Sequence, residues 1–217
     1  MKRALLVNPW VYDFKCHDFW IKPVGLLRLA SFLKDNGFNV DLIDCMDRLD
    51  RDAPEEFKKS DNFGRGAFYS EEITKTGPYT RVPRKYKRYG MTVEAFEKKL
   101  SSIERPDIIF TSSSMTYNYE GVVLANRIIK EKFLKPVVLG GIYPTLCREH
   151  AQKYSKADYV WASELNNDFI MMVNKLASVR MEMRNEQYFD ELAPDYSLYE
   201  KLDSAAVKFT KGSPFGV

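Results

Sequence analysis

Short apolar runs alternate with segments of helical period along most of this chain. In the first part they predict a strand at residues 4–7, a helix at 24–34 and a strand at 40–44. The first strand stops at Asn8-Pro9-Trp10, and the helix is bounded by Pro23 in its first turn and by Asn36-Gly37 after its last. A strand, a helix and a second strand in such close succession predict a right-handed parallel unit.

The same alternation resumes at Thr92, which has the side chain of a helix N-cap. The expected elements are helices at about 92–103, 120–133, 145–154 and 164–177, and strands at 107–111, 137–139 and 158–162. Five strands that alternate with helices predict an α/β fold with a doubly wound, flavodoxin- or Rossmann-like parallel sheet of five strands.

Two segments carry no sustained apolar period. Residues 46–90 are rich in charge, Gly, Pro and Tyr, and they predict a long insertion with one short helix near 53–59. From Ser178 onward the chain is charged, then rich in Tyr, and it has one late apolar piece at residues 205–209. We therefore expect one α/β domain over residues 1–177 and a linker or C-terminal tail over 178–217.

Length and composition favour a single globular core, with 217 residues of which 45% are hydrophobic. The cysteines Cys16, Cys45 and Cys147 are widely spaced and odd in number, which implies neither a disulfide framework nor a metal knuckle. Reduced thiols are typical of the cytoplasm. The N-terminal apolar run is too short for a signal peptide, and no stretch approaches the roughly 20 apolar residues that span a bilayer. We therefore expect a cytoplasmic protein with no membrane partner.

The insertion holds a basic stretch with interleaved tyrosines, whereas the formal net charge of the whole chain is only +3. Basic residues mixed with aromatic ones can follow a nucleic-acid backbone and stack bases; the basic residues here are Arg81, Arg84, Lys85, Lys87 and Arg88. Acidic residues lie close by in the sequence, and no nucleic-acid motif accompanies the stretch. A solvated loop or a protein contact surface is therefore favoured over nucleic-acid binding.

Four loops after predicted strands form the expected ligand site, because ligands of open parallel sheets bind outside the carboxyl ends of the strands. They are the aromatic loop 8–22, Thr111-Ser112-Ser113-Ser114-Met115-Thr116, Gly140-Gly141-Ile142-Tyr143-Pro144-Thr145 and Ser163-Glu164-Leu165-Asn166-Asn167. Paired glycines admit a flat group or a phosphate, hydroxyls donate and accept hydrogen bonds, and aromatic rings offer a flat apolar wall. Each loop also has a structural explanation, as a tight turn, an N-cap or a lid on the core.

The usual signatures of catalysis are missing from the sequence. No Gly-x-Gly-x-x-Gly follows the first strand, and no Walker loop is present. The strand ends offer no nucleophile, base and orienting group that would make a triad. We therefore assign no catalytic residue.

Four segments together carry a family resemblance: Asn8-Pro9, Asp18-Phe19-Trp20-Ile21-Lys22-Pro23-Val24-Gly25-Leu26-Leu27, Thr111-Ser112-Ser113-Ser114-Met115-Thr116-Tyr117 and Gly140-Gly141-Ile142-Tyr143. Over residues 1 to about 175 and on into the tail, the chain resembles the N-terminal cobalamin (vitamin B12)-binding domain of B12-dependent radical SAM proteins. In that family the tail leads to a Thr-x-Gly-Cys-Pro-Phe motif, whose cysteine is the first of three that bind a four-iron cluster. Here the frame reads Thr210-Lys211-Gly212-Ser213-Pro214-Phe215, with Ser213 in the place of that cysteine.

The resemblance implies a corrinoid-binding domain that is not catalytic alone. An iron–sulfur cluster of this kind needs cysteine thiolates, so the cluster, S-adenosylmethionine and a radical SAM barrel as partner domain would belong to a full-length relative. By the resemblance, residues 178–217 are the linker and the start of that missing barrel. The alternative is a vestigial structural or interaction domain that no longer binds a corrinoid. It is favoured by the fourth loop, where Ser163-Glu164-Leu165-Asn166 replaces the family's Gly-Glu-Gly turn.

The strand-end rule and the resemblance assign cofactor binding to Asn8, Pro9, Trp10, His17, Ser113, Ser114, Met115, Thr116, Gly140, Gly141 and Tyr143. By resemblance, the residues from Ser113 to Thr116 and the pair Gly140-Gly141 fall where the family's loops line the nucleotide tail of cobalamin. The Asp-x-His-x-x-Gly motif that supplies a histidine to cobalt in the broader fold is absent, as it is from many radical SAM relatives. His17 is therefore either a cobalt ligand or, as we favour, a solvent-facing loop residue, and we assign no metal ligand.

Overall fold

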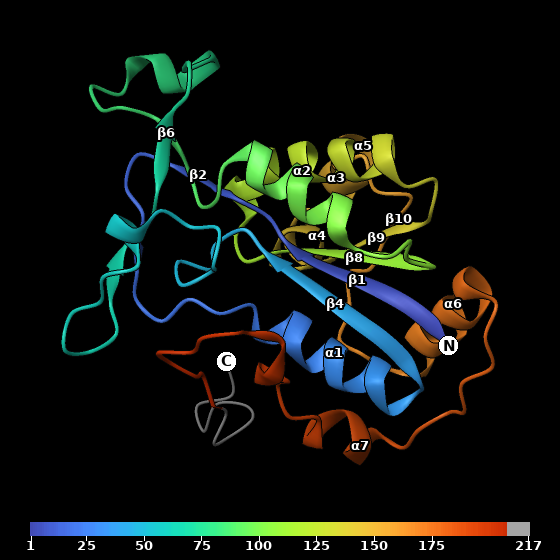
Figure 1. The fold of residues 1–217 in the computed structure, drawn as a ribbon. Helices are drawn as coiled ribbons and strands as arrows, with labels where there is room; N and C mark the ends of the chain where they lie inside the picture. The colour runs from blue at the N-terminus through green and yellow to red at the C-terminus, as the bar shows by residue number, and fades with distance from the viewer. Residues whose placement is uncertain (208–217) are drawn as a thin grey trace, which may run out of the picture.

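The computed structural model describes residues 1–207, and its centre is a five-stranded, all-parallel sheet (Figure 1). The strands lie in the order β4-β1-β8-β9-β10. Their bounds are β1 (Lys2–Asn8), β4 (Phe38–Asp44), β8 (Ile108–Ser113), β9 (Val137–Gly141) and β10 (Tyr159–Val160). This arrangement confirms the predicted α/β fold and is the flavodoxin-like one, in which the second strand of the sheet lies outside the first.

Helices cover both faces of this sheet (Figure 1). One face is covered by α1 (Val24–Asp35) and α6 (Asn167–Ala177), and the other by α2 (Val93–Ser102) and α3 (Tyr119–Lys132). Alternate residues of β1 serve the two cores: Leu6 packs with the residues of α1 and α6, and Leu5 packs with those of α2 and α3. Burial on both faces explains why this strand is a continuous apolar run in the sequence.

Local signals set two helix ends close to where the sequence predicts them. Gly37 has φ +80 directly after α1, a conformation that glycine adopts without strain. At the start of α2, Thr92 Oγ1 accepts a hydrogen bond from Ala95 N at 3.1 Å, so Thr92 is the N-cap.

Three predicted elements differ in their bounds. The helix expected at 145–154 is two helices, α4 (Ile142–Leu146) and α5 (Arg148–Tyr154), because the backbone of Cys147 is not helical. The helix expected from residue 164 begins only at Asn167, since the Asn166 side chain caps it by accepting from Phe169 N. The strand expected at 158–162 is reduced to the two residues of β10 at the edge of the sheet.

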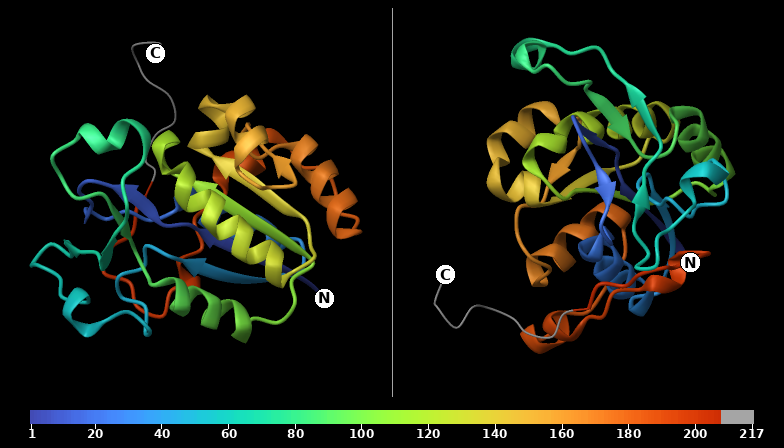
Figure 2. Two further views of the ribbon diagram at one scale, coloured as in Figure 1. Left: turned by 90° about the horizontal axis from the view of Figure 1, so that it is seen from above. Right: turned by 90° about the vertical axis from the view of Figure 1, so that its left-hand side faces the viewer.

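The predicted insertion pairs with the first loop and lies at the carboxyl edge of the central sheet (Figure 2). β2 (Val11–Asp13) pairs antiparallel with β7 (Lys87–Tyr89), and β7 also pairs with β6 (Ser70–Glu72). β3 (His17–Asp18) pairs with β5 (Gly66–Ala67). The sequence does not predict these strands because each is two or three residues long, too short to show a period.

One turn of 3₁₀ helix, η1 (Glu55–Phe57), stands where the sequence predicts a short helix near 53–59. A second 3₁₀ segment, η2 (Gly77–Arg81), lies outside that range, between β6 and β7. The hairpin made by β6, η2 and β7 projects from the body of the molecule (Figure 1).

The segment after Ser178 is packed against the domain over its described length. It contains α7 (Glu186–Glu191) and a 3₁₀ turn, η4 (Tyr196–Leu198), and it runs beside α1 (Figure 2). Phe189 and Leu192 are buried in the same core as Phe32 of α1. Arg28 of α1 also donates hydrogen bonds to the backbone oxygens of Phe189 and Leu192.

The Thr210–Phe215 frame that carries part of the family resemblance lies outside the described residues. Within residues 1–207, no helix has both the length and the apolar content that crossing a bilayer requires.

Candidate functional site

The strand order reverses between β1 and β8, whose last residues are Asn8 and Ser113. The chain leaves β1 toward α1 on one face of the sheet and leaves β8 toward α3 on the other face. Diverging connections of this kind open a crevice between the two strand ends, and ligands of doubly wound sheets bind there. Three cavities lie at this point, and we call them the inner, middle and outer cavity.

The inner cavity lies between the sheet and helices α1 and α6 and has a volume of about 220 Å³. Its side walls are mainly apolar, and they include Leu26, Leu29, Phe110, Val138, Trp161 and Phe169. These walls come from helices and strands of the core, apart from Trp161 just after β10. An apolar hollow with a few polar groups is the common form of a small-molecule site.

Gly140 and Gly141 end β9 and line the inner cavity, and their roles differ. A Cβ on Gly140 would meet only Trp161 O, at 4.0 Å, so this glycine leaves its side-chain space open. Gly141 has φ +94, and a Cβ there would lie 2.6 Å from both Ser112 Oγ and Ser113 O. Gly141 therefore permits β8 and β9 to approach closely, and Gly140 widens the cavity.

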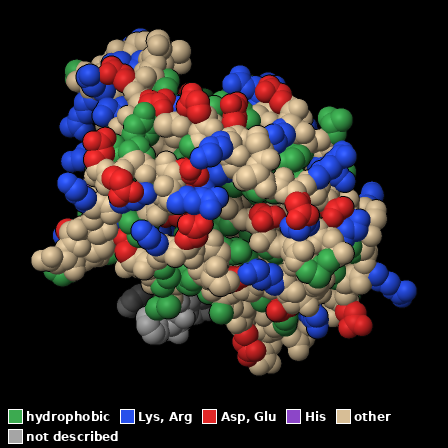
Figure 3. All heavy atoms as spheres, in the orientation of Figure 1, with side chains coloured by type: hydrophobic (Ala, Val, Ile, Leu, Met, Phe, Trp, Pro, Cys, Tyr) green, Lys and Arg blue, Asp and Glu red, His purple; other side chains and the backbone are tan. Residues whose placement is uncertain are grey.

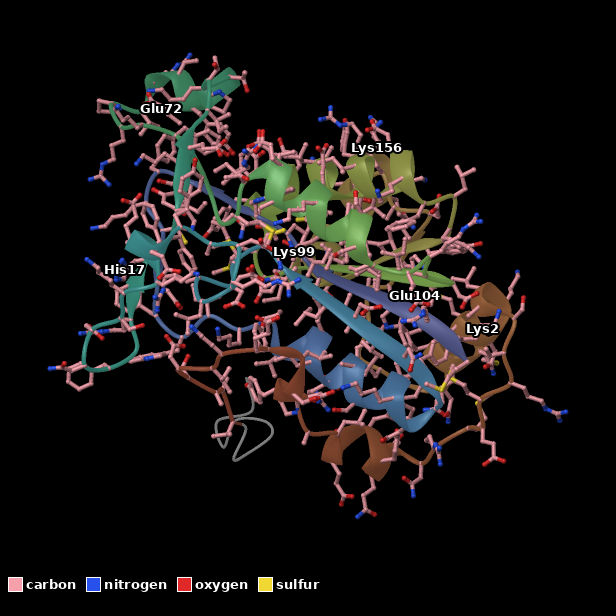
Figure 4. The ribbon with its side chains drawn as sticks, in the orientation of Figure 1. Lys2, His17, Glu72, Lys99, Glu104 and Lys156 are labelled. Carbon is pink, nitrogen blue, oxygen red and sulfur yellow. The ribbon has the colours of Figure 1, made fainter. Side chains whose placement is uncertain are left out.

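The outer cavity lies between the first loop and the loop after β8 and has a volume of about 470 Å³. Phe19, Met115 and Tyr117 line it and are 55%, 46% and 45% exposed. His17 also lines it, with its ring 5.1 Å from that of Phe19, and Figure 4 shows this histidine on the side of the insertion. Burial, aided by nearby carboxylates, raises the pKa of the neighbouring Cys16 thiol to about 12, so this cysteine is neutral.

The middle cavity is small, about 30 Å³, and it lies between the other two at the switch point, with lining residues in common with each, so we call the three a row. It shares Ser112 with the inner cavity, and it shares Ile21, Ser114 and Asn118 with the outer one. Asn118 is 5% exposed, and its Oδ1 has no hydrogen-bond partner within residues 1–207. A buried acceptor of this kind favours a ligand or water that donates a hydrogen bond to it.

A strained turn presents the aromatic side chains of the first loop. Trp20 has φ +65, which is uncommon for a large side chain. Two hydrogen bonds hold this conformation: Asp18 Oδ1 accepts from Ile21 N at 3.1 Å, and Trp20 Nε1 donates to Phe63 O at 2.6 Å. Strained backbone is frequent at binding sites, where the surrounding structure stabilises it.

Buried charged groups lie behind the strand ends of β1 and β4. Asp44 ends β4, and its Oδ1 accepts hydrogen bonds from Asn8 Nδ2 at 2.6 Å and from Met46 N at 2.9 Å. Burial raises the pKa of Asp44, although these hydrogen bonds act in the opposite direction. Burial and the charge of Asp44 also raise the pKa of Asp47 to about 7, although Lys22 Nζ lies 4.0 Å from its carboxylate.

Positive side chains gather on the projecting hairpin (Figure 3), but several are paired with acids of the same hairpin. Lys85 Nζ lies 2.8 Å from Glu72, and Arg88 bonds Glu71 while its guanidinium faces the Trp10 ring at 5.5 Å. Arg81, at the end of η2, and Arg84, between η2 and β7, are exposed. This surface is separate from the three cavities.

The structure brings most of the residues predicted for the site to the row of cavities. Asn8, Pro9, Trp10, Ser113 and Ser114 line the middle cavity, His17, Ser114 and Met115 the outer one, and Gly140 and Gly141 the inner one. The Ser113 hydroxyl donates to Met115 O at 2.7 Å, which holds the turn after β8. Thr116 begins the 3₁₀ turn η3 (Thr116–Asn118) and lines none of the three.

Two of the predicted aromatic residues are almost fully buried. Trp10 is 1% exposed, donates from Nε1 to Met91 O at 2.6 Å and packs against Phe96. Tyr143 is also 1% exposed, and its hydroxyl lies 2.7 Å from His150 Nδ1. Within residues 1–207, no three His, Cys, Asp or Glu side chains come together to hold a metal ion.

Sequence reasoning missed two features: the apolar walls of the inner cavity, and the buried charged groups at the ends of β1 and β4. The wall residues Leu26 and Leu29 are three apart in a helix, and Phe110 and Val138 lie in core strands, so nothing local distinguishes them from other core residues. Asp44 follows no motif, and Lys22 lies in the predicted first loop without any sign of its charge pairing. The strand-end position of Asp44 is the one signal that could have identified it.

No protein-family model matches the chain, and no curated protein matches it. Among solved structures, it is similar to the radical S-adenosylmethionine methyltransferase TsrM from Kitasatospora setae with tryptophan substrate and the SAM analogue aza-SAM bound. The TM-score is 0.50 and the identity 16%, over 82% of this chain and 25% of that chain. A structure of TsrM with cobalamin and a 4Fe–4S cluster bound gives a TM-score of 0.49 at the same identity and coverage. The chain thus spans about a quarter of the length of TsrM, and the likeness shows the fold.

Proposed function

We propose that this chain is a corrinoid-binding domain, which takes cobalamin across the row of three cavities and is not catalytic alone. The observation that carries the proposal is the order of the row: a mainly apolar cavity of about 220 Å³ against the core, a small cavity at the switch point, and an exposed cavity of about 470 Å³. Cobalamin has two such parts, a compact aromatic base on a nucleotide tail and a wide corrin ring.

The inner cavity fits the aromatic base, withdrawn from cobalt in the base-off form of the cofactor. Its walls are apolar, and Gly140 leaves open the space in which any larger residue would place a side chain. Phe110, Trp161 and Phe169 offer aromatic surface to a flat ring. The likeness in fold to TsrM, a protein described with cobalamin bound, supports a corrinoid as the ligand.

The outer cavity fits one face of the corrin ring. Phe19, Met115 and Tyr117 supply exposed apolar surface, and the unpartnered Oδ1 of Asn118 can accept a hydrogen bond from a carboxamide of the corrin periphery. His17 is the histidine that lines this cavity, which keeps it as a candidate cobalt ligand.

When bound, a corrinoid supplies a cobalt centre that can carry a methyl group. The residues described above would bind and orient the cofactor. An iron–sulfur cluster and S-adenosylmethionine would be supplied by a radical SAM barrel as partner. The fold likeness covers only 25% of the TsrM chain, which leaves room for such a partner in a relative of that size.

The test is to mix the protein with hydroxocobalamin, remove free cofactor on a desalting column and record the visible spectrum. We expect corrin absorbance to co-elute at close to one equivalent. Gly140→Val should abolish co-elution by filling the inner cavity. Asn39→Val, which adds the same branched side chain to β4 near the amino end of the sheet, is the matched control and should bind as the wild type does.

Two further outcomes separate the alternatives. A spectrum that changes in His17→Ala would identify His17 as a cobalt ligand, and an unchanged spectrum would exclude it. A colourless wild-type protein without a thermal shift at high cofactor would contradict the proposal and favour a structural domain that keeps the fold without the ligand.

A further inference from the structure

Residues 195–207, which we call the strap, follow α1 to the carboxyl edge of the sheet (Figure 1). Asp195 starts the strap on α1: its backbone N donates to Leu27 O at 3.1 Å, and its carboxylate pairs with Lys34 at 2.5 Å. The strap then reaches the charged groups behind the ligand site at two points, Tyr199 and Asp203.

Tyr199 is the first point of contact. Its hydroxyl donates to Asp44 Oδ2 at 2.6 Å, while the other oxygen of Asp44 accepts from Asn8 Nδ2 at 2.6 Å. The Tyr199 ring also lies against Lys22, with Nζ 4.8 Å from its centroid. Asn8 and Lys22 both line the middle cavity, so two cavity residues are held by one tyrosine of the strap, one of them through Asp44.

The Tyr199 hydrogen bond favours the ionised form of Asp44, and through it one direction of the Asn8 amide. A carboxylate only accepts hydrogen bonds, so an ionised Asp44 requires Asn8 to present its NH₂ group to it. The carbonyl oxygen of Asn8 then remains as an acceptor at the end of β1. Without the Tyr199 hydroxyl, the buried Asp44 Oδ2 loses its donor, which favours protonation or rotation of Asp44 and releases this constraint on Asn8.

Asp203 is the second point of contact, and it acts on Arg48. The Arg48 side chain is 1% exposed, and it bonds Asp203 at 3.0 Å and Asp18 at 3.3 Å. The same guanidinium donates to three backbone oxygens of the insertion, those of Phe57, Lys59 and Gly64. Asp18 in turn holds the strained turn of the first loop, so this chain of contacts ends at the outer cavity.

We propose that the strap is a positioning element of the ligand site, with Tyr199 setting Asn8 through Asp44 and Asp203 setting the first loop through Arg48. Docking of the strap and the shape of the middle and outer cavities are then one equilibrium. A ligand that fits the cavities only when the strap is docked binds more tightly to the docked state. By linkage, the bound ligand shifts the equilibrium of the strap toward that state. This last step rests on the proposed function, whereas the coupling itself does not.

Hydrogen–deuterium exchange on the ligand-free protein tests the coupling. Tyr199→Phe keeps the ring and removes the hydroxyl, and Tyr196→Phe is the matched control, since the Tyr196 hydroxyl bonds Ala206 O within the strap at 2.6 Å. We expect exchange in peptides covering residues 5–14 to rise by about tenfold in Tyr199→Phe. In Tyr196→Phe, these peptides should exchange as in the wild type. Asp203→Asn should instead raise exchange in peptides covering residues 16–21.

Hydroxocobalamin titration of the same variants tests the consequence for binding. The affinity should fall by about tenfold in Tyr199→Phe and stay unchanged in Tyr196→Phe, and bound cofactor should slow exchange in the strap. If no version binds cobalamin, the proposed function fails, but the exchange data on the ligand-free protein still decide the coupling. Equal exchange in residues 5–21 for the wild type, Tyr199→Phe and Asp203→Asn would overturn the strap proposal, as would the same increase in Tyr196→Phe.

Discussion

The inner and outer cavities belong to one row but are built by different means. The inner cavity is walled mainly by core residues, such as Phe110 at 2% exposure and Phe169 at 2%. The outer cavity is lined by loop residues such as Phe19 and Met115, which are about half exposed. The inner cavity is therefore as rigid as the fold, whereas the outer one depends on a few polar contacts between distant segments. Four pairs of substitutions and conditions can break or sharpen this contrast.

The largest contrast should come from removing one phenylalanine ring on each side. Phe110→Ala empties space in the core and should lower the free energy of unfolding by about 3–5 kcal/mol. Phe19→Ala removes a ring that is 55% exposed and should change it by less than about 0.5 kcal/mol. Urea unfolding of both variants measures the difference. Equal losses would mean that the first loop is part of the core.

The second largest contrast should come from replacing two arginines near the outer cavity, one buried and one exposed, and comparing the free energies of unfolding. Arg48→Met leaves Asp18 and Asp203 without their buried partner and should cost about 3 kcal/mol of unfolding free energy. Arg65→Met is the control, since Arg65 pairs with Asp61 while both side chains are 36–41% exposed, and such pairs contribute about 0–1 kcal/mol. Thermal and urea unfolding measure both variants. A loss in Arg48→Met no larger than in Arg65→Met would show that the buried network does not hold the outer side together.

The adjacent glycines of the inner cavity test how tightly its edge is built. Gly141→Ala forces a Cβ against Ser113 O at φ +94 and should cost about 2–3 kcal/mol. Gly140→Ala points into open space and should change unfolding by no more than about 0.5 kcal/mol. If Gly140→Ala is the more damaging of the two, the cavity edge differs from the one described.

The last contrast is a pH dependence that arises at Asp47, beside the end of β4. The folded protein keeps the Asp47 proton up to a pKa of about 7, whereas the unfolded carboxyl loses it near the ordinary pKa of 3.8. Between those two values the folded state binds more protons, so the free energy of unfolding should fall as the pH rises and level off above about pH 8. We expect a decrease of about 4 kcal/mol from this group, at about 1.4 kcal/mol for each pKa unit. Urea unfolding from pH 4 to 8 measures it, and Asp47→Asn should show a flatter profile than the wild type.

The same contrast explains how much the sequence could predict. The five strands and the helices that form the inner cavity can be predicted from the spacing of their apolar residues. The pair Gly140-Gly141 can be recognised at the end of a predicted strand. The residues of the cavity walls cannot be predicted in this way, because the sequence around Leu26 and Phe110 does not distinguish them from other core residues. Only the fold brings them to the same cavity. The site could therefore be located to a strand edge but not to its lining.

The outer side could be predicted still less. The pairing of His17 with Ala67 and the contact of Arg48 with Asp203 join residues far apart in the sequence, and neither leaves a periodic pattern. Aromatic residues in loops were a guide in one case and not in another: Phe19 lines a cavity, whereas the Tyr143 ring is buried and its hydroxyl lies against His150. Residue type and loop position do not determine which way a ring points.

The pairing of β2 with β7 also bears on how the protein folds. This small sheet forms only when Val11 of the first loop pairs with Tyr89, which lies at the far end of the insertion in the sequence. Closing a loop of that length costs entropy before any contact repays it, so such pairings form slowly. The central sheet joins β1 to β4 through a single helix and can form much earlier. The carboxyl edge of the sheet, where the candidate site lies, should therefore be the last region to fold. A folding intermediate that precedes this step would have a native core but no native ligand site.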